Sequence, residues 1–154
     1  MKIIKKILIF LLIVLIALQF YRPAKNLSEN ETTAQFELET KPTDDISTIL
    51  RNKCYDCHSN NTNYPWYAEV SPISLWINGH IEEGKEHFNV SDWKNFSIKK
   101  KDHKLEELVE EVEEGKMPED TYTWMHGNLD ANEKQALIDW AKATRNLYDV
   151  KASD

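Results

Sequence analysis

The hydrophobic residues after position 43 recur at i, i+3 and i+4 in four stretches, which is the spacing of an amphipathic helix. The first stretch has Asp44 or Asp45 as its expected N-cap and leads directly into Cys54. The second begins at Ser71 and Pro72, a pair that favours a helix start. The residues that form the apolar faces of these two helices are Ile46, Ile49 and Leu50, then Ile73, Trp76, Ile77 and His80.

The third and fourth stretches also carry boundary signals. The third ends at Gly115, a residue type that commonly follows the last turn of a helix. Asp130 and Glu133 have the spacing of a capping box at the start of the fourth. The apolar positions are Leu105, Leu108, Val109 and Val112, then Leu137, Trp140, Ala141, Thr144 and Tyr148. Because no alternating strand pattern is present, the sequence predicts an all-α domain over residues 44–150.

A nearly continuous apolar run covers residues 7–18 and follows three lysines at positions 2, 5 and 6. With Phe20 and Tyr21 at its end, this segment predicts an N-terminal transmembrane helix over residues 1–21. A cleaved signal peptide is the alternative, although the small residues that cleavage requires are missing at positions 18–22. Since positive charge stays in the cytoplasm, we expect a single-pass protein of the bacterial inner membrane with its C-terminal domain in the periplasm.

Residues 22–43 are polar and acidic, with few large apolar side chains. This composition predicts a flexible tether, and a partly ordered arm that uses Phe36 and Leu38 is the alternative. The whole chain has 26 acidic and 19 basic residues, a net charge of -7. Nucleic acid is therefore not an expected partner, whereas an acidic surface is compatible with a basic redox partner or with solubility alone.

Cys54, Tyr55, Asp56, Cys57 and His58 spell C-x-x-C-H and include both cysteines of the chain. This motif predicts covalent attachment of one haem. Two thiols at this spacing lie on about one helical turn, so each can bond to one haem vinyl group while the adjacent imidazole binds the iron. The predicted cofactor is thus a single haem c, attached through Cys54 and Cys57 and ligated by His58.

Three other kinds of site also contain cysteine and histidine and are alternatives to haem attachment. A zinc site needs four ligands, and no cysteine remains after Cys54 and Cys57, so a distant histidine would have to complete it. A thioredoxin-like redox pair is expected in a βαβ pattern, whereas the residues before Cys54 have a helical pattern. A structural disulfide does not require the following His58.

The iron ligand on the face opposite His58 has to be assigned separately. Met117 is the leading candidate, because it lies between Gly115 and Pro118 in a stiffened loop before the last helix. A methionine ligand raises the reduction potential relative to a second histidine, which suits an electron carrier. His80 and His126 are the alternative ligands, and an open distal face is the third possibility.

The order of these residues is similar to that of the small haem-binding domain proteins of Bacteroidota and related bacteria. The resemblance covers about residues 44–145 and implies a cytochrome-c-like helical fold with one haem c, bound through the motif cysteines and His58, with Met117 at the distal position. The N-terminal anchor is also similar to those proteins. The matching segments are 54–60, 64–67, 71–72, 80–81 with Gly84, 115–118, Tyr122, His126 and 136–140.

These observations lead to three functional hypotheses. The first is a membrane-anchored monohaem c-type cytochrome that carries single electrons between redox partner proteins in the periplasm or inner membrane and is not itself an enzyme. The second is a haem-based peroxidase-like enzyme, or a gas or redox sensor, with an open distal site where His80 or His126 would act as acid, base or hydrogen-bond donor. The third is a zinc or thiol-redox module without haem.

Overall fold

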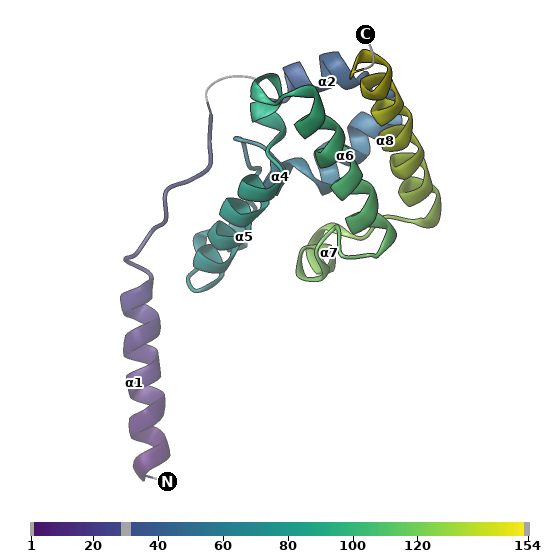
Figure 1. Ribbon diagram of the computed structural model, residues 1–154. Coiled ribbons are helices and arrows are strands. Elements are labelled where there is room, and N and C mark those ends of the chain that lie inside the picture. Colours follow the sequence, from purple (N-terminus) through teal and green to yellow (C-terminus); the bar gives the residue numbers. More distant parts are fainter. Residues whose placement is uncertain (1, 29–31, 153–154) are drawn as a thin grey trace.

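The structure, a computed structural model, describes residues 2–28 and 32–152, and every regular element within these ranges is helical (Figure 1). The prediction of an all-α protein is therefore confirmed. The α-helices are α1 (Lys2–Leu18), α2 (Ala34–Thr40), α3 (Asp44–Lys53), α4 (Tyr55–His58), α5 (Ile73–His87), α6 (Ile98–Glu113), α7 (Asp120–His126) and α8 (Ala131–Ala152), and the 3-10 helices are η1 (Trp66–Glu69) and η2 (Val90–Asn95).

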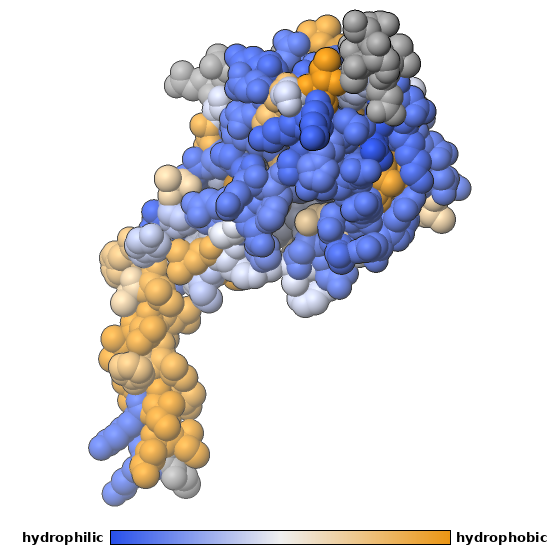
Figure 2. Space-filling model, viewed as in Figure 1, coloured by the Kyte–Doolittle hydropathy of each residue, from blue (hydrophilic) through white to orange (hydrophobic). Residues whose placement is uncertain are grey.

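The prediction of an N-terminal transmembrane helix is wrong. Helix α1 has 17 residues, three of them lysines at its start, whereas a spanning helix needs about 20 apolar residues. Across residues 2–28 and 32–152, no helix combines the length and the apolar character that crossing a bilayer requires. The predicted single-pass location in the inner membrane, which depended on this helix, is overturned as well. Helix α1 projects from the helical body and carries exposed apolar side chains (Figures 1 and 2).

The four helices predicted from hydrophobic spacing are present as α3, α5, α6 and α8. The N-cap of α3 differs from the prediction: the side chain of Thr43 accepts from the Ile46 amide, and Asp44 is already helical. At the start of α8 the capping box is confirmed, because the Asp130 and Glu133 side chains each accept from the other's amide at 2.9 Å. Gly115 ends the α6 segment with a φ of 74°, in the left-handed region that favours glycine.

The core lies where α6 packs along α8, with α3 against α8 and with α2 packed on η2. Phe36 of α2 is fully buried and makes edge-to-face contacts with Tyr55, Phe88, Trp93 and Trp140. Such aromatic pairs contribute packing energy beyond the apolar area they bury. Since Tyr55 belongs to the C-x-x-C-H motif, the same cluster ties α2 directly to the candidate site.

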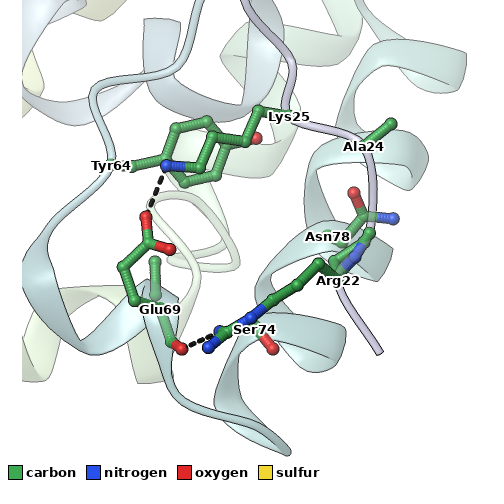
Figure 3. A pocket seen from close by; sticks show the side chains of 9 residues that line it. Arg22, Ala24, Lys25, Tyr64, Glu69, Ser74 and Asn78 are labelled. Carbon is green, nitrogen blue, oxygen red and sulfur yellow. Dashed lines mark hydrogen bonds and ion pairs between the residues drawn. The ribbon is translucent and has the colours of Figure 1, made fainter. Parts of the chain in front are cut away.

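Residues 22–43, predicted as a tether or as a partly ordered arm, contact the domain at two places within their described parts. In α2, Phe36 is buried while Leu38 is 69 % exposed. Further toward the N-terminus, Lys25 lies over the Tyr64 ring and forms an ion pair with the Glu69 carboxylate, and Arg22 donates to the backbone carbonyl of Glu69 (Figure 3). These contacts border a cavity of about 240 Å³ between this segment and the η1–α5 region.

Asn26 extends these contacts to the loop that follows the motif. Its side-chain amide donates to Ser59 O at 2.8 Å and to Thr62 Oγ1 at 2.9 Å, and its amide oxygen accepts from Lys85 Nζ. The backbone amide of Asn26 donates to the Tyr64 hydroxyl at 2.8 Å. The segment around Asn26 thus joins the loop after the motif to α5.

Candidate functional site

The C-x-x-C-H motif lies on a single helical turn. Cys54 is both the C-cap of α3 and the N-cap of α4, and its carbonyl accepts from the amides of Cys57 and His58 at 3.2 and 3.0 Å. Both cysteines are free thiols and partly buried. The buried Ser59 hydroxyl donates to Tyr55 O at 2.8 Å, so the turn is also fixed at its C-terminal end. The structure therefore places Cys54, Cys57 and His58 on one short turn, as the sequence predicts.

The imidazole of His58 is oriented by two backbone carbonyls of α5 and its C-terminal end. Nδ1 lies 2.9 Å from Gly84 O and 2.8 Å from Phe88 O. Carbonyl oxygens only accept, so Nδ1 carries the proton and the lone pair is on Nε2. Burial lowers the pKa of His58, which favours the neutral ring. A neutral imidazole with Nδ1 bonded to a carbonyl is the usual state of a metal-binding histidine.

Gly84 allows α5 to approach the motif this closely. A Cβ atom at this position would lie 2.9 Å from Cys57 O and 3.1 Å from Cys57 Cβ, so a side chain would push α5 away. The sequence contained no specific signal for this contact, because Gly79 lies on the same helix and has nothing within 4 Å of its Cβ position. The sequence could not indicate the contact with the Phe88 carbonyl, because every residue has a backbone carbonyl.

The two thiols share an environment that keeps them protonated. Burial raises the pKa of Cys54 to about 12, and the neighbouring Cys57 and Asp56 add to the effect. Burial likewise raises the pKa of Cys57 to about 12, with further contributions from Asp56 and Glu119. At neutral pH both side chains are therefore thiols, which distinguishes them from reactive redox cysteines with a lowered pKa.

The loop that contains Met117 lies close to the motif. Met117 is 37 % exposed and its amide donates to Glu111 O at 3.1 Å, while the adjacent Pro118 is buried. Burial alone would raise the pKa of Glu119, but hydrogen bonds from Thr121 and Tyr122 and the charge of His80 bring it below its usual value. The charge of Glu119 also raises the pKa of Cys57, and the loop leads into α7, whose Tyr122 hydroxyl lies 2.9 Å from Asp56 Oδ2.

The two histidines considered as alternative distal ligands have other contacts. His126 Nε2 is 2.8 Å from the Tyr67 hydroxyl, and its ring stacks on Tyr122 with centroids 4.1 Å apart. His80 packs edge-to-face against Trp76 at 4.3 Å on α5. Tyr67 is a site residue for which the sequence gave no chemical signal.

Several large apolar side chains remain exposed on the elements around the motif. Helix α5 packs against α4, and η1 contacts α7 through Tyr67 and His126. A flat apolar group such as a porphyrin, bound at the motif, would cover side chains of this kind, which a folded protein otherwise tends to bury. The exposed residues are Trp66 (78 %), Trp76 (45 %), Met117 (37 %), Trp124 (79 %) and Met125 (64 %).

The donor set therefore suits haem: two protonated thiols, one neutral imidazole and apolar surroundings. Zinc would need three or four ligands gathered at one point. Within the described part of the chain no group of three or more His, Cys, Asp or Glu side chains is arranged to hold a metal ion.

Comparison with known protein families identifies a match over most of the chain. The model of a family described as haem-binding domain aligns with residues 13–143, a range that contains the motif, the Met117 loop, α7 and most of α8. No curated protein and no solved structure matches the chain significantly.

Proposed function

The chain belongs to the haem-binding domain family, and from this premise we propose that the protein is a monohaem c-type cytochrome that carries single electrons. In this proposal one haem c is attached through Cys54 and Cys57 in the domain of residues 44–150. His58 ligates the iron on one face and Met117 on the other. The partners are redox proteins that donate and accept one electron at a time.

Cys54 and Cys57 would form the covalent links. Each thiol adds across one vinyl double bond of the haem, so that sulfur bonds to one carbon and the thiol proton goes to the other. The addition needs no external oxidant or reductant. Their position on one turn next to His58 supports this role, because both links and the iron ligand then come from one rigid segment.

The orientation of His58 is the main structural support for the proposal. Gly84 O and Phe88 O fix the proton at Nδ1, and Nε2 is the nitrogen that ligates iron. A second-shell carbonyl also raises the basicity of the imidazole as a ligand. Iron ligation by Nε2 explains why His58, a partly buried histidine next to two thiols, has its Nδ1 bonded to two backbone carbonyls.

Met117 would complete the iron coordination. Its loop leads into α7, which contacts Asp56 of the motif through Tyr122. The thioether sulfur stabilises the ferrous state and so raises the reduction potential. The bound haem supplies a one-electron ferric/ferrous couple. A closed, six-coordinate site leaves no position for a substrate, which favours electron transfer over catalysis.

Expression together with a haem-attachment system tests the proposal. We expect a red protein whose haem absorbance stays with the chain after denaturation, and a weak far-red sulfur-to-iron band that disappears in Met117→Ala. Met125→Ala is the matched control, since it removes a methionine from neighbouring α7 and should keep the band. If the wild-type ferrous protein instead binds carbon monoxide immediately, the closed site is wrong and the peroxidase-like enzyme or gas sensor replaces it.

A further inference from the structure

Helix α7 is attached to the C-x-x-C-H turn by the side chain of Tyr122. The Tyr122 hydroxyl lies 2.9 Å from Asp56 Oδ2 and 3.0 Å from Asn52 O. Burial and the charge of Asp56 both raise the pKa of Tyr122, so the phenol remains a hydrogen-bond donor. Asp56 stands between the two cysteines, and this contact therefore joins α7 to the segment that would carry the haem.

A second attachment is formed by His126 at the other end of α7. Its ring stacks on Tyr122 at an interplanar angle of 6°, and its Nε2 is hydrogen-bonded to the Tyr67 hydroxyl of η1 at 2.8 Å. Lys53 Nζ donates to His126 O and to Gly127 O, the latter at 2.9 Å. Four side chains thus connect α4, η1 and α7. We call them the α7 network: Asp56, Tyr67, Tyr122 and His126.

The α7 network also bears on the position of Met117. Met117 precedes the first residue of α7 by three positions, and Glu119 between them accepts from the Tyr122 amide at 3.3 Å as the N-cap of α7. The loop is attached to α6 on its other side by the bond from Met117 N to Glu111 O. No residue of α7 is buried. Its location therefore depends on these polar and stacking contacts more than on core packing.

We propose that Tyr67, Tyr122 and His126 are positioning residues that hold α7, and with it Met117, against the iron face opposite His58. This inference rests on the proposed function, because it requires Met117 to be the distal ligand. It assigns His126 a role different from that of a ligand: its Nε2 is bonded to Tyr67, and its ring stacks on Tyr122. Loss of either phenol hydroxyl would let the loop move away and leave the distal position open for part of the time.

The test uses the full-length haem-bearing protein and removes single hydroxyl groups. Tyr122→Phe keeps the ring that stacks on His126 but breaks the contact with Asp56, and Tyr67→Phe breaks the contact with His126 Nε2. For each variant we expect a weaker far-red sulfur-to-iron band and a lower reduction potential. Carbon monoxide should combine with the ferrous protein roughly three to ten times faster, the range expected for loss of one hydrogen bond. Tyr21→Phe, an exposed tyrosine outside the network, is the matched control.

The outcomes separate this inference from the proposed function. A wild-type protein without the sulfur-to-iron band overturns both. A wild-type protein with the band, together with Tyr67→Phe and Tyr122→Phe variants that match it in band intensity, potential and carbon monoxide kinetics, overturns the inference alone. Tyr67 is only partly buried, so Tyr67→Phe remains an informative variant even if Tyr122→Phe fails to fold.

Discussion

The two sides of the candidate haem site are built in different ways. On the His58 side, α4 and α5 are in direct backbone contact, two carbonyls orient the imidazole, and Tyr55 joins the buried aromatic cluster. On the Met117 side, α7 has no buried residue, and the exposed side chains Trp124 and Met125 face outward. Contacts within the protein thus fix the His58 side, whereas on the Met117 side no apolar surface in the described part of the chain buries a residue of α7. We infer that haem supplies such a surface.

The largest effect is expected where the His58 side meets the core. Phe36→Ala removes a fully buried ring that contacts Tyr55 and Phe88 and leaves a cavity, so the free energy of unfolding should fall by about 3–5 kcal/mol. Urea unfolding of the haem-bearing protein measures this. Leu38→Ala, on the same helix but 69 % exposed, is the control and should change stability by less than about 0.5 kcal/mol. A loss for Phe36→Ala as small as that expected for Leu38→Ala would show that α2 does not support the site.

A smaller effect is expected at the contact between α5 and the motif. Gly84→Ala places a Cβ against Cys57 O and should cost about 1–3 kcal/mol, because backbone atoms must shift. Gly79→Ala is a closely matched control: it lies on the same helix, has nothing within 4 Å of its Cβ position, and should stabilise the helix by up to about 1 kcal/mol. Thermal unfolding of both variants measures the difference. Equal stability would contradict the close approach of α5.

The pH dependence of the haem-free chain tests the environment of His58. Burial lowers its pKa in the folded state, so the unfolded chain binds a proton more readily near the ordinary value of 6.5. The stabilising contribution of the neutral ring is present above that value and is lost as pH falls through the lower, folded-state pKa. Between about pH 7.5 and pH 5 the wild type should therefore lose more stability than His58→Gln. Equal losses in urea unfolding would mean that His58 is not shielded from solvent.

The smallest effect in the haem-free chain is expected on the Met117 side. Trp124 is 79 % exposed, so Trp124→Ala should change the stability of the haem-free chain by less than about 0.5 kcal/mol. In the haem-bearing protein the same substitution should destabilise by a larger amount, because the ring then covers apolar surface of the cofactor. Unfolding of both forms gives the two values. An unchanged stability in both would place Trp124 outside the haem site.

Hydrophobic spacing was sufficient to predict the helices that carry the core. Helices α3, α6 and α8 each bury one apolar face, and this leaves a periodic signal such as that of Leu137, Ala141 and Tyr148. Helix α5 was predicted from the same spacing, but its buried residues are Ser74 and Ile81, whereas Ile73 and Trp76 of the predicted apolar face are 41 % and 45 % exposed. The short helix α7 was not predicted, because it buries nothing and has no apolar face. For α1 the apolar run was correctly seen, but its length within a helix falls short of a bilayer.

The residues of the site could be predicted only in part from the sequence, because only some of them leave a recognisable pattern. The C-x-x-C-H motif identifies its residues because their chemistry requires adjacent positions along the chain, and the family match bears out a haem-binding protein. The contacts that orient His58 come from backbone carbonyls 26 and 30 positions away, and backbone atoms carry no residue-specific signal. Tyr67, which lies in a segment of the family resemblance, and Asn26 were given no role, because hydroxyl and amide groups are common on protein surfaces and only the fold brings them to the motif.

We propose that Cys54 and Cys57 bind one haem covalently, with His58 as its iron ligand. Intact-mass measurement of the protein produced with a haem-attachment system tests this most directly. We predict a chain heavier by the mass of one haem, and no added mass after the double substitution Cys54→Ser and Cys57→Ser. A wild-type chain at its unmodified mass, in cells that load other c-type cytochromes, would show that this chain does not bind haem covalently.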